Sequence, residues 1–180
     1  MKKILLSAIS LFAAVSLWAG VIVAPESKLV EKMVEQEMPA ECFAAGELQF
    51  DVYAAWATST SENTILENNG WGGGIGINYF ITRYFGIGID GTWLAVDQTL
   101  HAFSGSLIAR LPFEGPICWA PYLFIGGGAM FDSSSTGEAH VGGGFDIRLT
   151  PSVGILLDSR YNFGGLDEWV LTRLGLRFIF

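Results

Sequence analysis

The sequence contains one motif with the spacing of a phosphate-binding loop. Residues 86–91 read GIGIDG, which matches the G-x-G-x-x-G pattern of dinucleotide-binding folds. Such a loop needs a helix that opens at its third glycine, but Gly91 is followed by TWLAVD, which has β-forming residues and no helical period. Glycine clusters recur in GWGGGIG, FIGGG and HVGGG, which a single phosphate loop does not explain. We therefore interpret GIGIDG as part of a strand and expect no cofactor.

Few residues could perform catalysis or bind a metal. The two histidines are His101 and His140, and Ser104 and Ser106 follow the first, which raises acyl transfer as a chemistry. In an extended chain Ser104 and His101 lie on opposite faces, outside the hydrogen-bond reach that a general base needs. No Cys/His cluster has the spacing of a metal site. We expect neither an enzyme nor a metal protein.

The N-terminus predicts export. Residues 1–20 combine two lysines, an apolar stretch and small residues, the pattern of a secretory signal peptide with cleavage near Ala19 or Ser16; an uncleaved anchor is the alternative. Residues 21–45 would then be a separate periplasmic segment, part of it a short amphipathic helix or a solvated tail.

From Gly46 onward the sequence alternates with period two, the pattern of strands that have two different faces. Each alternating segment is close to the roughly 9–11 residues that a tilted strand uses to cross a bilayer. The mean hydropathy is high, +0.41, yet no apolar run after residue 24 reaches the roughly 20 residues of a membrane helix. The predicted strands are 47–57, 71–81, 84–95, 101–111, 121–131, 139–149, 153–163 and 169–180.

One face of these strands is predicted to be apolar; on the fifth strand we assign to it Tyr122, Phe124 and Met130. We interpret the eight strands as a barrel in a membrane, with the apolar face outward and the other face inward. The lumen of an eight-stranded barrel is only wide enough for side chains. Charges on the inner face must therefore pair, because unpaired buried ions cost several kcal/mol each. A soluble sandwich, which buries the apolar face, is the alternative. The predicted interior ion network is Asp51, Asp90, Arg110, Asp146, Arg148, Asp158, Arg160, Arg173 and Arg177.

Aromatic residues and connections favour the barrel. Aromatic side chains fall near both ends of the strands on the apolar face, as the two interfaces of a bilayer favour. Every proline of this region falls at one end of the strands, and an even strand number places both termini on that side, the periplasmic one. The other set carries acids that we interpret as ordinary solvated charge, with divalent-cation binding as the alternative: Glu62, Glu67, Asp97, Asp132, Glu138, Asp167 and Glu168. This charge, like the net charge of −8, argues against nucleic acid as a partner.

The chain ends in RLGLRFIF. Here Arg173, Gly175, Phe178 and Phe180 match the polar residue, glycine and spaced aromatics of the C-terminal signal that outer-membrane barrels present to their assembly machinery. With NYFITRYFGIGIDGTW and TPSVGILLDSRYNF, residues 46–180 resemble the small eight-stranded outer-membrane barrels, the OmpA transmembrane domain and OmpX class. The resemblance implies an all-β, antiparallel, up-and-down barrel in the outer membrane of a Gram-negative cell, in contact with lipid, lipopolysaccharide and the assembly machinery.

Cys42 and Cys118 are the only cysteines, in a chain predicted to enter a compartment where disulfides persist. The predicted topology puts both on the periplasmic side. A disulfide would therefore draw the N-terminal segment across the periplasmic mouth as a lid, and closing a loop of about 75 residues contributes roughly 4 kcal/mol in the chain-entropy description. Two free thiols are the alternative.

These features predict an integral outer-membrane protein with a filled, salt-bridged interior and a structural or surface-interaction role in the envelope; they identify no surface partner. The alternatives are a narrow gated pore for ions or small solutes and, less favoured, a lipid-modifying enzyme.

Overall fold

The structure is a computed structural model, and it describes residues 42–60, 69–95, 99–131, 135–164 and 168–180. The predicted signal peptide and all but the end of the predicted periplasmic segment lie outside the described residues. Within those residues no helix is long and apolar enough to cross a membrane.

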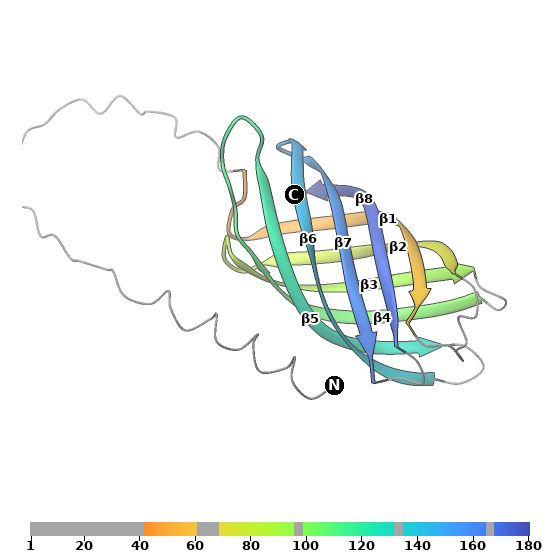
Figure 1. The fold of residues 1–180 in the computed structure, drawn as a ribbon. Coiled ribbons are helices and arrows are strands. Elements are labelled where there is room, and N and C mark those ends of the chain that lie inside the picture. Colours follow the sequence, from red (N-terminus) through yellow and green to blue (C-terminus); the bar gives the residue numbers. More distant parts are fainter. Residues whose placement is uncertain (1–41, 61–68, 96–98, 132–134, 165–167) are drawn as a thin grey trace, which may run out of the picture. The chain divides into compact units, whose positions relative to one another are not determined.

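The described residues form eight strands, each at a predicted position (Figure 1). The largest shift is at the sixth strand, which begins at Ser135 instead of 139. The strands are β1 (Glu47–Ser59), β2 (Gly70–Phe80), β3 (Phe85–Ala95), β4 (Thr99–Arg110), β5 (Trp119–Phe131), β6 (Ser135–Thr150), β7 (Val153–Phe163) and β8 (Trp169–Ile179).

The strands close into a barrel in sequence order, and every neighbouring pair is antiparallel. Closure is made between β1 and β8, where Asp51 lies opposite Arg177. The predicted fold class is therefore confirmed. We call the end at which β1 begins and β8 ends the terminal end, and the opposite end the loop end.

The outer surface of the barrel is apolar on every strand. Aromatic pairs lie on it near both ends: Trp56 stacks on Trp71 toward the loop end, and Phe50 lies beside Phe178 toward the terminal end. A soluble barrel would expose polar residues here, so this surface needs an apolar surrounding. Its exposed aliphatic side chains include Val52, Ile75, Ile89, Leu107, Ile125, Val141, Leu157 and Leu174.

On β5 the predicted assignment of faces is wrong. Tyr122, Phe124 and Met130 point into the lumen and are buried, whereas Leu123 and Ile125 point outward with 61% and 58% of their surface exposed. The segment YLFIGGGAMF is apolar or glycine at both alternating sets of positions, so its hydrophobicity does not distinguish the faces. Tyr122 therefore does not belong to the aromatic residues of the outer surface.

Candidate functional site

The lumen contains the nine ionisable residues of the predicted network, and each takes part in at least one ion pair. They point inward because they occupy alternate strand positions, opposite the apolar outer face. The ion pairs form two clusters, one at the terminal end and one at the middle of the barrel.

The terminal cluster is centred on Arg177. Its guanidinium donates two hydrogen bonds to Asp51, from Nε to Oδ1 and from Nη2 to Oδ2, both 2.7 Å long. It donates a third, from Nη1 to Asp146 Oδ2, at 2.8 Å. Arg148 Nη2 also donates to Asp146 Oδ2, at 3.2 Å. Two arginines thus share one fully buried carboxylate, and the bonds of Arg177 to Asp51 and Asp146 join β8 to β1 and β6.

Glu47 also belongs to this cluster, although the sequence analysis did not assign it. It accepts bonds from Arg110 Nη1 at 3.0 Å and from Arg148 Nη2 at 2.5 Å. Glu47 shares its face with Asp51 by strand alternation, a signal that was available, but it is the first residue of β1 and resembled a flanking polar residue.

The central cluster alternates negative and positive side chains from three strands, β3, β7 and β8. Arg173 donates to both oxygens of Asp158, at 2.7 and 2.9 Å, and its Nη1 lies 3.3 Å from Asp90. Arg160 Nη1 donates to Asp90 from the other side at 3.1 Å, and Tyr122 donates its hydroxyl to Asp158. The two clusters occupy the terminal and middle parts of the lumen, where their paired charges pack beside the buried apolar side chains of Phe80, Ile108 and Phe124.

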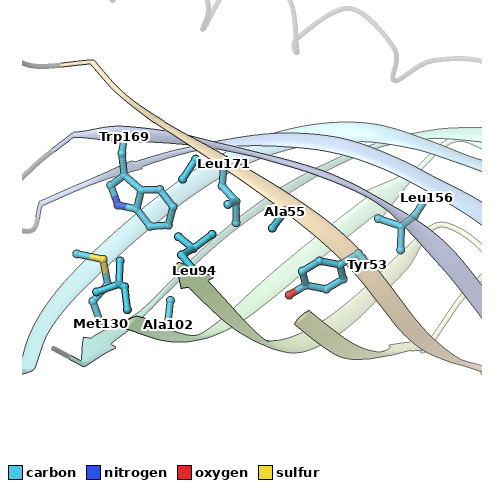
Figure 2. Close-up of a cluster of buried hydrophobic side chains, with 10 residues drawn as sticks. Tyr53, Ala55, Leu94, Ala102, Met130, Leu156, Trp169 and Leu171 are labelled. Atoms are coloured by element: carbon cyan, nitrogen blue, oxygen red, sulfur yellow. The ribbon is translucent and has the colours of Figure 1, made fainter. Parts of the chain in front are cut away.

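Toward the loop end the lumen is filled by apolar side chains, which the sequence analysis did not predict. Figure 2 shows Trp169, Leu171, Leu94 and Met130 gathered there, on the inner face of β8, β3 and β5. Trp169 and Leu171 have 1% and 0% of their surface exposed. We call this group the apolar cluster; its further members at this end are Ala57, Leu100 and Ala102.

Glu138 was interpreted as a solvated loop acid, and that interpretation is wrong. It lies within β6, points into the lumen beside the apolar cluster and has 7% of its surface exposed. Trp169 Nε1 donates to its Oε2 at 3.2 Å, while its Oε1 has no hydrogen-bond partner. Among the described residues no arginine or lysine forms an ion pair with it. The error arose because β6 extends four residues further toward the loop end than predicted.

The remaining predicted loop acids are placed as follows. Glu62, Glu67, Asp97, Asp132 and Asp167 lie outside the described residues. Glu168 is exposed at the loop end, where it accepts a bond from the Tyr161 hydroxyl at 2.5 Å. Within the part of the chain that the structure describes, no group of three or more His, Cys, Asp or Glu side chains could hold a metal ion.

Ser106 and His140 form a contact that the sequence analysis missed. Ser106 Oγ lies 2.9 Å from His140 Nε2, across β5, because Gly126 between them in the register has no side chain. Strand alternation places both on the inner face, a signal that was available. However, His140 is fully buried and its Nδ1 has no hydrogen-bond partner, so no carboxylate orients the ring. His101 lies on the outer face, away from Ser104, as expected.

The terminal mouth is closed by the residues that precede β1. Cys42 and Cys118 are joined by a disulfide, with their Cα atoms 6.1 Å apart. Next to it Phe43 is fully buried, with the guanidinium carbons of Arg148 and Arg110 at 4.4 and 5.0 Å from its ring centre. We call residues 42–46 the strap.

The C-terminal motif is divided between the two faces of β8. Arg173 and Gly175 point into the lumen, where a side chain at Gly175 would overlap Tyr53. Phe178 and Phe180 lie at the terminal end of the barrel, and Phe180 has 76% of its surface exposed. Recognition of this motif by an assembly factor stays a prediction.

No protein-family model matches the chain, and no curated protein matches its sequence. Solved structures do match. The N-terminal β-barrel domain of Pseudomonas aeruginosa OprF is similar with a TM-score of 0.54 and 14% identity, over 76% of this chain and 99% of that chain. The chain has the fold of the small eight-stranded outer-membrane β-barrels.

Two further matches show how far this likeness extends. Neisserial surface protein A has a TM-score of 0.53 at 19% identity, over 76% of this chain and 99% of that chain. A de novo designed transmembrane β-barrel has a TM-score of 0.51 at 17% identity, over 76% of this chain and 97% of that chain. Since a designed protein shares this small-barrel fold, the fold alone does not specify a biological role.

Proposed function

We propose that this chain is an integral outer-membrane protein with a closed, non-conducting lumen, and that its role in the envelope is structural or one of surface interaction. The single observation that carries the proposal is that the barrel has its apolar side chains outside and its charged side chains inside, the reverse of a soluble protein. Its outer wall is apolar and exposed on all strands, while its charged residues face inward and pair.

A bilayer is the surrounding that suits this arrangement. The exposed aliphatic side chains match hydrocarbon, and the aromatic pairs near both ends match the two interfaces. The terminal end would face the periplasm, because bacterial barrels with an even strand number keep both termini there. In that orientation Phe178 and Phe180 lie at the periplasmic interface, within reach of the barrel-assembly machinery.

The filling of the lumen supports a closed barrel over a pore. An ion entering from the terminal end meets the strap and then arginines whose charge is taken up by carboxylates. An ion entering from the loop end meets the apolar cluster, which offers no group to replace its hydration shell. The strap, the ion pairs and the apolar cluster together support a closed lumen over a conducting one.

Two measurements on one sample test the proposal. The full chain should be found in the outer-membrane fraction and migrate differently on gels with and without heating, as folded barrels do. Purified protein in planar bilayers should then show no single-channel conductance above the lipid background. Recovery of monomeric, detergent-free protein in the aqueous fraction would refute membrane insertion. Reproducible conductance steps would instead favour the narrow pore.

A further inference from the structure

The strap closes the terminal mouth by three kinds of contact. The Phe43 ring packs against the guanidinium groups of Arg148 and Arg110, and cation–π contacts of this kind strengthen where water is excluded. Arg110 Nη2 donates to the carbonyl oxygen of Ala44 at 3.1 Å. Gly46 N donates to Phe80 O at 2.8 Å and adopts a positive φ of 77°, which turns the strap into β1.

The strap shields the two arginines beneath it. Only 1% of the Arg110 side chain and 3% of the Arg148 side chain is exposed, although both residues lie at the end of the barrel. Phe43 covers them, so their exposure depends on the position of the strap. By contrast Arg160, with 0% exposure, lies in the central cluster, away from the strap contacts.

The disulfide is the covalent anchor of the strap, and it can be approached from outside. Cys42 and Cys118 are both partly exposed. They line a pocket of about 220 Å³ together with Pro116, Arg148, Thr150 and Pro151. A thiolate that entered this pocket would come close to the sulfur atoms of the disulfide.

We infer that the disulfide is a reducible latch and the strap a plug that withdraws when the latch opens. A dithiol supplies the electrons. Its first thiolate attacks one sulfur of the disulfide and forms a mixed disulfide, releasing the other cysteine as a thiolate. The second thiolate of the dithiol resolves the mixed disulfide, so that the latch gains two electrons and two protons while the dithiol becomes a disulfide.

With the latch open, Phe43 is held by non-covalent contacts alone, and local opening of the strap becomes a low-energy event. The fitting partner is therefore a protein or small-molecule dithiol that reaches the terminal mouth. Opening of the strap exposes the terminal cluster, whereas the central cluster and the apolar cluster stay buried.

Arginine labelling of the folded, full chain in detergent tests this inference. Phenylglyoxal modifies accessible guanidinium groups, and peptide mass spectrometry locates them before and after treatment with dithiothreitol. Labelling of Arg110 and Arg148 should rise at least about tenfold on reduction, equivalent to about 1.4 kcal/mol in the opening equilibrium. Arg160 should stay unlabelled in both states, and Arg83, with 30% exposure, should be labelled in both.

Two variants separate the latch from the plug. The pair Cys42→Ser and Cys118→Ser should label like the reduced protein without any dithiol. Phe43→Ala keeps the disulfide and should also raise the labelling of Arg110 and Arg148, because the covering ring is gone.

Each remaining outcome overturns the inference. A disulfide that resists the dithiol in the folded barrel is no latch. Reduction without added labelling shows that the strap stays in place unaided. A parallel rise at Arg160 shows that the disulfide holds the whole barrel together. Unchanged labelling in Phe43→Ala shows that this ring is not the seal.

Discussion

In the terminal and central parts of the lumen, arginines and carboxylates pack among a few apolar side chains, and each charge of the ion network has a partner. In the part near the loop end, Trp169, Leu171 and their neighbours fill it, and the one buried acid among them, Glu138, has no ion-pair partner in the described chain. The same barrel thus closes its interior by two physical routes. The first depends on a complete set of partners, whereas the second depends on volume. This difference predicts opposite responses to the same kinds of substitution.

Arg177→Met should have the largest effect. It leaves Asp51 without its two-bond partner and removes one of the arginines at Asp146, so we expect a loss of about 3–5 kcal/mol in the free energy of unfolding. Urea titration in lipid vesicles, followed by tryptophan fluorescence, measures it. Arg83→Met is the matched control, because its ion pair with Glu114 is exposed and should contribute less than about 1 kcal/mol. Equal losses for the two variants would contradict the importance of buried pairing.

Arg148→Met should follow, at about 3 kcal/mol, because it removes a partner from Asp146 and Glu47. Both carboxylates keep a second arginine, which makes this loss smaller than that of Arg177. The same urea titration applies. A loss under about 1 kcal/mol would mean that Arg110 and Arg177 take up the freed carboxylates, and that the cluster is redundant.

Leu171→Ala tests the volume-dependent part of the lumen. Leu171 is fully buried, so we expect a cavity and a loss of about 2–3 kcal/mol. Leu174→Ala is the control on the same strand; Leu174 faces outward with 57% exposure, where surrounding acyl chains can fill the lost volume. If the two variants lose the same stability, the apolar cluster is no better packed than the outer wall.

The sequence predicted these two parts of the lumen unequally, for a physical reason. On β7 and β8 charged and apolar residues alternate, so Asp158 and Arg173 could be placed in the lumen from the pattern. On β5 both faces are apolar or glycine, so the inward position of Phe124 depends on packing against His140. Trp169 and Leu171 are as apolar as residues on the outer wall, so hydrophobicity alone does not separate them; their even spacing from Arg173 on β8 places them in the lumen, a signal that was available.

The disulfide and the ion-pair partners show the same limit. Cys42 and Cys118 could be placed at one end of the barrel from the strand count alone. The pairing of Arg173 with Asp158, or of Arg177 with Asp51, depends on how far each strand is shifted against its neighbours, and residue spacing does not contain that shift.

Glu138→Gln should have the smallest effect and the opposite sign. Glutamine keeps an acceptor for Trp169 Nε1 and nearly the same volume, but it removes a buried charge that no ion pair compensates. We therefore expect a gain of about 1 kcal/mol in the free energy of unfolding at pH 7, since the desolvation of that charge disappears.

Glu47→Gln is the decisive control, because the same chemical change occurs there in the ion-paired part of the lumen. Glu47 accepts bonds from Arg110 and Arg148, so its neutralisation leaves cationic groups undercompensated and should lower stability by about 2–3 kcal/mol. Urea titrations of both variants, run side by side in the same vesicles, give the two signs directly. A loss in both would mean that Glu138 has a compensating cation or water network after all. A gain in both would mean that the desolvation of these carboxylates destabilises the barrel by more than their ion pairs with arginine stabilise it.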